Sequence, residues 1–366
     1  MFERRLYYHL DLALLGAVVL LSALGAAMIY SITYDHVRQA PGREFWVQLY
    51  ALAIGFGALL FCLTVDYRRL AEHSLLIYLA VAGALVWVLF FGAVRGGSRR
   101  WIDLGPFNLQ PSEFARLALA LVLAMYYGEN RRGARTTADL LVGAGFTAPL
   151  FLLIARQPDL GTAATLLPVF LGTAYVAGLR LRLLAIVAIA GVLTAPVAWR
   201  YFLEDYQRER VVTFLDPERD PRGAGYQQIQ ARITVGSGGL TGRGFMQGTQ
   251  GQYKFLPVAH NDFIFSVLAE EQGFVGVLVA LGLYLFVIVR SLEAARLAKD
   301  RLGAYLVGGL VAGFAFQVIY NITMSAGLAP VKGLTLPLMS YGGSAAIATL
   351  AGFGLVLNVR MRRFTN

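Results

Sequence analysis

The sequence has little charge and almost no cysteine, and each shortage limits what the protein can be. Of its 366 residues, 15% are charged and 57% are hydrophobic, whereas a soluble domain has about 25% charged residues. The single cysteine, Cys62, allows no intramolecular disulfide, and the absence of CxxC or HxxxH spacing argues against a zinc site. No GK[ST] motif follows the glycine-rich run at 236–252, which argues against a nucleotide-binding loop.

Long apolar runs occupy most of the chain instead. Runs of about 17–25 apolar residues recur, and each can cross a ~30 Å hydrocarbon core as a helix. We therefore predict an all-α polytopic membrane protein, a single domain over 1–366, with about ten transmembrane helices. Membrane lipids are expected partners and nucleic acid is not. The predicted spans are 10–31, 45–65, 74–94, 112–127, 139–155, 160–177, 183–200, 262–289, 304–325 and 343–358.

The net charge of +10 is distributed unevenly between the two sides. Basic residues gather in the short loops on the side of the N-terminus, for example at 131–135, 290–301 and 360–363. This bias predicts that both termini are cytoplasmic. The loops on the opposite side are longer and more polar, so we expect an active site that faces outward.

The longest connection, 201–260, joins the predicted seventh and eighth helices and is expected to be extracytoplasmic. It has too few large apolar residues to bury a core of its own. Residues 226–236 have an amphipathic pattern, which is typical of an interfacial helix. The glycine-rich run after them predicts a flexible loop.

Asp262 is the leading candidate for chemistry, because it stands where a polar stretch enters an apolar run. Acids at such positions usually face a cavity or a partner. Asp262, Ser266 and Glu270 recur at four-residue spacing and would share one helix face. Alternatively, Asn261 or Asp262 caps the helix N-terminus. The spacing alone leaves both interpretations open.

Further candidates lie in the outer loops or in the first turns of the helices that follow them. Glu113 and Arg116 are three residues apart and can form an ion pair on one helix face. Asp159 is either a turn residue or a cavity acid. The remaining candidates are cationic or can become so, and together they would suit a phosphate-bearing lipid head group. They are Arg99, Arg100, Lys254, His260 and Lys332.

One reaction that uses a carboxylate beside cations is transfer of a sugar from a lipid diphosphate to a hydroxyl group. The diphosphate is a good leaving group that needs cationic stabilisation. The hydroxyl nucleophile needs a general base, for which one aspartate suffices. The residues permit this chemistry without demanding it.

Several segments also resemble a known family. These are GGSRRWIDLGPFNLQPSEFARLA, QPDLGTA, GSGGLTGRGF, FLPVAHNDFIFSVLAEEQGFVG and NITMSAGLAPVKGLTLPLMSYGGSA. In the same order they resemble segments of the SEDS family of cell-shape, division and sporulation proteins, and the short tails make the chain most similar to the RodA (elongation) branch. The resemblance covers nearly the whole chain.

The resemblance implies a peptidoglycan glycosyltransferase that polymerises lipid II on the outer face of the bacterial cytoplasmic membrane during cell elongation. It implies a class B penicillin-binding protein as partner, which crosslinks the new glycan. The family's presumed catalytic acid falls on Asp262, and the glutamate of its QPSE motif falls on Glu113.

The sequence departs from the family pattern at three positions. Val258 stands where many relatives have glutamate, Asn261 stands where they have threonine, and Arg116 stands where lysine is common. Arg116 would stabilise the diphosphate together with the other cations, and Glu113 would orient Arg116 or help to place a cation. Whether a divalent cation (Mg or Mn) is needed stays open.

Two other functions compete with this one. A lipid II flippase would need polar groups on both faces and a path between them. A scaffold that only recruits a penicillin-binding protein would need no catalytic acid. The concentration of polar residues on one face favours the glycosyltransferase.

Overall fold

The structure is a computed structural model that describes residues 9–35, 37–95, 98–103, 105, 108–129, 136–201, 205–221, 223, 225–253 and 255–364. Its longer helices are α1 (Leu12–Thr33), α2 (Arg43–Thr64), α4 (Ser74–Phe91), α5 (Pro111–Glu129), α6 (Thr137–Ala155), α7 (Leu160–Val176), α8 (Leu181–Tyr201), α12 (Ile264–Arg296), α13 (Arg301–Ser325) and α14 (Gly343–Met361). Shorter helices are α3 (Tyr67–Glu72), α9 (Asp205–Leu215), α10 (Tyr226–Ser237) and α11 (Thr249–Gln252), with 3₁₀ turns at Pro217–Arg219 and Arg362–Phe364.

The prediction of an all-α membrane protein is confirmed. Seven of the described helices are long and apolar enough to cross a membrane, namely α1, α2, α4, α6, α12, α13 and α14. The helix α7 and the first part of α8 are shorter apolar helices, and α5 carries two ionisable residues, Glu113 and Arg116, in its first turns. Each predicted span matches one of these ten helices to within a few residues, except that α12 continues to Arg296.

Small antiparallel sheets, which the sequence did not predict, lie between some helices. The strand β1 (Tyr34–Asp35) pairs with β2 (Ala40–Pro41), and the second sheet has the order β3 (Ala93–Arg95), β4 (Ser98–Asp103), β5 (Asn108–Leu109). The register of the second sheet places Ile102 opposite Leu109. This sheet leads the chain from α4 directly into the first turn of α5.

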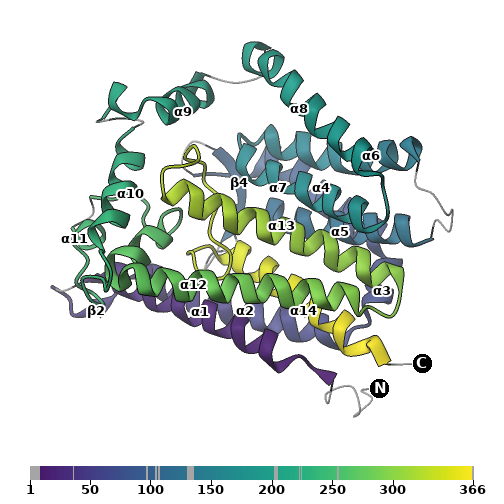
Figure 1. Cartoon of the computed structure of the whole chain (residues 1–366), viewed down its shortest axis with the longest axis horizontal. Coiled ribbons are helices and arrows are strands. Elements are labelled where there is room, and N and C mark those ends of the chain that lie inside the picture. The colour runs from purple at the N-terminus through teal and green to yellow at the C-terminus, as the bar shows by residue number, and fades with distance from the viewer. Residues whose placement is uncertain are drawn as a thin grey trace.

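The bundle has two distinct ends. The helix α1 begins and α14 ends at the same end, where α3 also lies, while α10 and α11 lie at the other end (Figure 1). We call the end with α10 and α11 the site end. The shared position of the two terminal helix ends agrees with the predicted placement of both termini on one side.

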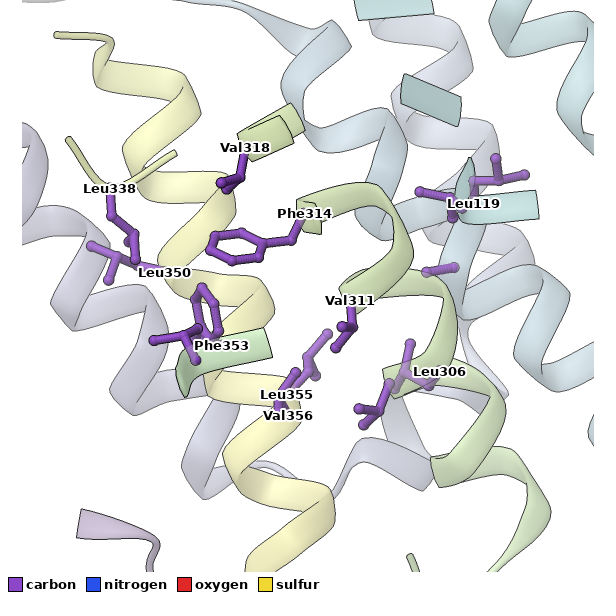
Figure 2. Packing of buried hydrophobic residues seen from close by; sticks show 14 of the residues in the cluster. Leu119, Leu306, Val311, Phe314, Val318, Leu338, Leu350, Phe353, Leu355 and Val356 are labelled. Carbon is purple, nitrogen blue, oxygen red and sulfur yellow. The ribbon is translucent and has the colours of Figure 1, made fainter. Parts of the chain in front are cut away.

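The core of the bundle is built around α13 and α14. The rings of Phe314 and Phe353 meet edge to face, with centroids 5.0 Å apart, and Figure 2 shows them packed between the two helices. The helix α14 also approaches α2 closely, because Gly354 lies against the backbone of Leu59 and leaves no room for a side chain. Small residues let membrane helices approach in this way, and packing then replaces the hydrophobic effect as the main attraction.

An ion network joins three helices at the end opposite the site. Asp11 accepts a hydrogen bond from Arg290 Nε (3.0 Å) and forms an ion pair with Arg360 Nε (2.9 Å). Glu293 accepts from the same two arginines at 2.6 and 3.2 Å. Because the side chains of Asp11 and Arg360 are nearly buried, this network fixes the ends of α1, α12 and α14 relative to one another.

At the site end, α12 is broken at Gly273, whose φ of 65° and ψ of −167° are not helical. The broken turn is filled by residues 238–244, which we call the plug segment. Four backbone hydrogen bonds join the plug segment to α12, from Phe274 N to Gly239 O (3.0 Å), Val275 N to Leu240 O (3.2 Å), Arg243 N to Glu270 O (2.9 Å) and Gly244 N to Glu271 O (3.0 Å).

The glycine-rich run is therefore not the free loop that the sequence predicted. It satisfies backbone groups that a broken helix would otherwise leave unpaired inside the protein. Glycine is required on both sides of the contact, because a Cβ at Gly273 would collide with the backbone nitrogen of Gly242. The predicted amphipathic helix is present as α10, and α9 precedes it.

Candidate functional site

Asp262 lies at the end of a tight turn, two residues before α12 begins. Its N–H donates to the carbonyl of Val258 at 3.2 Å. The N-cap position of α12 is Phe263, and no side chain caps this helix end. The capping interpretation of Asn261 and Asp262 is therefore wrong, because the turn delays the start of the helix.

The backbone of Asp262 is fixed by α13. Asn321 Nδ2 donates to Asp262 O (2.9 Å) and to Leu334 O (2.6 Å). Asn321 is fully buried. One amide group thus holds the start of α12 and the loop between α13 and α14 side by side.

The same loop approaches the carboxylate of Asp262. A Cβ added at Gly333 would lie 3.8 Å from Asp262 Oδ2. Within the described residues, the carboxylate accepts no hydrogen bond. It is half-buried and lies beside a glycine, which has no side chain to cover it.

Burial raises the pKa of Asp262 to about 7. The positive charge of Arg210 lowers that pKa, and the negative charge of Asp159 raises it, both less than burial does. A carboxylate with a pKa near the working pH is well suited to accept a proton in a reaction. A carboxylate that capped a helix would have its pKa lowered instead.

Asp159 is held in place by several donors at once. It is the N-cap residue of α7, and its carboxylate accepts from Thr162 N (3.1 Å) and from Thr162 Oγ1 (3.0 Å). Gln110 Nε2 donates to it at 3.1 Å, and Arg100 Nη1 lies 3.5 Å away. Asp159 is therefore a buried turn residue that ties α7 to the loop before α5.

Arg100 is occupied by the same turn. Its guanidinium donates to the carbonyls of Gln157 (2.9 Å) and Pro158 (2.6 Å). Arg99 points elsewhere, since its Nη1 donates to Phe90 O at 3.1 Å and its side chain is exposed. The structure thus separates two neighbouring arginines that the sequence grouped together.

Glu113 and Arg116 form the ion pair that their spacing predicted, with Arg116 Nη2 2.6 Å from Glu113 Oε2. Both are nearly buried. Arg116 also donates to Gln317 Oε1 on α13, and Gln317 Nε2 donates to Thr335 O at 3.0 Å. A polar chain therefore runs from α5 through α13 to the loop that lies beside Asp262.

The remaining predicted cations differ in what they can do. The ring of His260 packs edge to face on Tyr341, and burial lowers its pKa, which disfavours the cationic form. Lys332 lies in the loop next to Gly333, and burial followed by the charge of Arg210 lowers its pKa. Lys254 lies outside the described residues.

Glu270 does not share a face with Asp262 as predicted. It is fully buried, and its carboxylate accepts from the backbone N–H groups of Thr249 (2.7 Å) and Gln250 (2.9 Å) at the start of α11. Ser266 is fully buried, and its hydroxyl has no hydrogen-bond partner within the described residues. Glu270 thus holds α11 and the plug segment against α12.

The described side chains do not form a resident cation site. Among them, no group of three or more His, Cys, Asp or Glu residues could hold a metal ion. Glu113 and Asp159 are already paired with arginine side chains.

Three residues of this site were not singled out as candidates. Gln317 and Asn321 lie one turn apart on α13, both buried, and polar residues four apart within an apolar span were the available signal. Arg210 stands in the charged run of α9, where nothing in the sequence distinguishes it from its neighbours.

Comparison with known proteins agrees with this geometry. Residues 11–364 match the family model for FtsW, RodA and SpoVE, described as "Cell cycle protein". The chain is 37% identical over 359 residues to the Escherichia coli K12 protein "Peptidoglycan glycosyltransferase MrdB", covering 97% of this chain and 94% of that protein. It is 36% identical to "Stage V sporulation protein E" of Bacillus subtilis, covering 95% of this chain and 96% of that protein.

Solved structures share the fold. A chain reported under "Structural coordination of polymerization and crosslinking by a peptidoglycan synthase complex" superposes with a TM-score of 0.84 and 36% identity, covering 98% of this chain and 99% of that chain. The rod shape determining protein RodA of Thermus thermophilus superposes with a TM-score of 0.73 and 32% identity, covering 98% of each chain. The protein therefore belongs to the FtsW/RodA/SpoVE family, the SEDS family of multi-pass membrane proteins.

Proposed function

We propose that the protein is a peptidoglycan glycosyltransferase that polymerises lipid II during cell elongation, with Asp262 as its general base. The observation that carries the proposal is the state of Asp262. Its carboxylate is half-buried, accepts no hydrogen bond from the described residues, and has a pKa raised by burial to about 7. The 37% identity to the E. coli peptidoglycan glycosyltransferase MrdB supports the reaction class.

The reaction follows from this placement. Asp262 takes the proton of the 4-hydroxyl of the acceptor's GlcNAc, and that oxygen attacks the anomeric carbon of the donor's MurNAc. The bond from that carbon to the diphosphate oxygen breaks, and its electron pair leaves on the diphosphate. Attack opposite the leaving group inverts the anomeric centre, and no second acid is needed because the diphosphate leaves as an anion.

The buried ion pair has a positioning role in this proposal. Because Arg116 is engaged by Glu113 and Gln317, it shapes the loop beside Asp262 and does not bind the diphosphate directly. Asp159 acts similarly on the turn that carries Arg100. Both acids are therefore supports of the site, while Asp262 does the chemistry.

The partner and the orientation belong to the same proposal. A class B penicillin-binding protein would crosslink the strands, in line with the synthase complex in which a similar chain was solved. The site end would face outward from the bacterial cytoplasmic membrane, with both termini cytoplasmic, because the basic loops lie at the opposite end.

The cavity beside the Glu113–Arg116 pair offers no route for a flippase. A cavity of about 50 Å³ lies below Glu113 and Arg116, and its other walls include Leu117, Phe314 and Phe353. It is too small and too apolar to pass a disaccharide diphosphate, which would need polar groups along its path. Asp262 is not among the residues that line this cavity, and most of those residues are apolar.

The test uses the full chain with a class B partner whose transpeptidase serine is replaced. Purified complex is given lipid II, and glycan strands are separated by size, while a parallel sample in vesicles is assayed for lipid II crossing. Glycan strands without vesicle crossing are expected. Lipid II crossing without glycan strands would indicate a flippase and contradict the proposal. If neither activity were detected, the protein would act as a scaffold, which also contradicts the proposal.

A further inference from the structure

We propose that Arg210, acting with Lys332, forms the subsite for the donor's diphosphate beside Asp262. This inference rests on the proposed function, because it names the part of the donor substrate that the site binds. It also changes which cations are expected to bind the phosphates. Arg210 lies on α9, outside the segments that the sequence analysis singled out.

The geometry starts from one backbone contact. Arg210 Nη1 lies 3.4 Å from Val331 O, the residue before Lys332. Gly333 follows, and its Cβ position is 3.8 Å from Asp262 Oδ2. Three consecutive residues of one loop thus lead from the guanidinium of Arg210 to the proposed base.

Other contacts keep this loop in place. Tyr320 Oη donates to Pro330 O at 2.9 Å, and Asn321 Nδ2 donates to Leu334 O at 2.6 Å. Both donors belong to α13, so the cationic stretch between residues 330 and 334 is fixed at two points. A fixed loop gives preorganised charge, which stabilises a leaving group better than mobile charge does.

The electrostatics agree with the distances. The charge of Arg210 lowers the pKa of Asp262 and also that of Lys332. Arg210 is therefore within electrostatic reach of the base and of the second cation. The negative charge of Asp159 has the opposite effect and raises the pKa of Asp262.

Two of the predicted cations are engaged elsewhere. Arg116 is held by Glu113 and Gln317, and Arg100 donates to two backbone carbonyls. Arg210 is exposed on α9, so a ligand can approach it from solvent.

A diphosphate diester fits this pair of cations. A planar guanidinium can bind two phosphate oxygens at once, and an ammonium adds a point charge. As the glycosidic carbon–oxygen bond breaks, the diphosphate gains one negative charge. Cations beside it therefore bind the transition state more tightly than the ground state, which is the condition for faster chemistry.

The test compares Arg210→Ala and Arg210→Lys with Arg208→Ala in the full chain bound to its partner. Arg208 is a matched control, because it lies on α9 but is paired with Asp205 at 3.3 Å. The probes are undecaprenyl diphosphate and undecaprenyl monophosphate, added both as inhibitors of polymerisation and as ligands in direct binding measurements.

Arg210→Ala should weaken inhibition by the diphosphate about tenfold or more and inhibition by the monophosphate much less. The acid limb of its pH–rate profile should move to higher pH, because the lost cation had lowered the pKa of Asp262. Arg210→Lys should recover part of both effects, and Arg208→Ala should show neither.

Equal diphosphate binding and an unmoved acid limb in Arg210→Ala would overturn the inference. Because Arg210 is exposed, its truncation opens no buried cavity, and retained partner binding checks the fold directly. If the wild type made no glycan yet bound the diphosphate through Arg210, the proposed function would fail while the subsite would stand.

Discussion

The amide of Asn321 donates to the backbone oxygen of Asp262 at 2.9 Å, so the proposed base is positioned by a helix that comes later in the chain. The same amide holds Leu334 O at 2.6 Å. The position of Asp262 therefore depends on α13 and on the loop that follows it, as well as on its own turn.

Asn321→Ala should lower kcat about tenfold or more, because a small misplacement of a reacting group is costly. KM should change little, since Asn321 is fully buried and bonds to the backbone of Asp262 and Leu334, so it does not contact the substrate itself. Thr323→Ala is the control, because its hydroxyl bonds only to carbonyls of its own helix. Steady-state polymerisation at varied lipid II measures both constants. Near wild-type kcat in Asn321→Ala would contradict the positioning role.

Glu113→Gln should destabilise the protein by about 3 kcal/mol, because it leaves the buried charge of Arg116 without its carboxylate. The double substitution Glu113→Gln with Arg116→Met should cost less than the sum of the two single substitutions. Thermal and denaturant unfolding in detergent measures these differences.

The exposed pair Arg38–Asp35 serves as the comparison, with a separation of 3.7 Å. Asp35→Asn should change stability by less than about 1 kcal/mol, because solvent screens an exposed pair. Equal losses at the two sites would show that burial of the Glu113–Arg116 pair has no energetic consequence.

Asp262→Asn should raise the thermal stability at pH 8. The pKa of Asp262 is raised from 3.8 to about 7 in the folded protein, so the folded state binds its proton more tightly than the unfolded state does. Stability is then fully present below the unfolded pKa and is lost as pH rises through about 7. The asparagine stays neutral and avoids this loss.

The gain from Asp262→Asn should therefore shrink as the pH is lowered toward the unfolded pKa. Melting temperatures of both proteins across this range test the sign. A gain that is independent of pH would mean that burial of the charge is not its cause.

Gly273→Ala should destabilise the site end by about 2 kcal/mol or more, because Gly273 has a backbone conformation that is nearly restricted to glycine. The new Cβ would also push the plug segment away. Gly282→Ala in the same helix meets no atom within 4 Å and should be neutral or stabilising by helix propensity. Hydrogen exchange of residues 238–244 locates the effect, and equal exchange in both variants would contradict it.

The membrane explains how far the sequence predicted the fold. Because the bilayer demands long apolar helices, run length alone located ten helices with small errors at their ends. The sequence also singled out Asp262 as a candidate, since an acid at the edge of an apolar run is costly. The pairing of Glu113 with Arg116 followed from their three-residue spacing.

What escaped prediction depends on contacts between distant segments. The break at Gly273 is stabilised by backbone hydrogen bonds to the plug segment some thirty residues earlier, and no local pattern announces them. The turn that keeps Asp262 out of α12 is likewise set by Asn321 and Val258. Arg210 reaches the site only because α9 folds back over the loop at Val331.

The most direct test of Asp262 as the general base is the rate of lipid II polymerisation by Asp262→Asn in complex with its partner. The asparagine keeps the shape of the side chain but cannot take a proton. The rate should fall by about a hundredfold or more, while partner binding is retained, and the wild-type rate should decline below a pH of about 7. A wild-type rate in the folded, partner-bound Asp262→Asn complex would contradict the assignment.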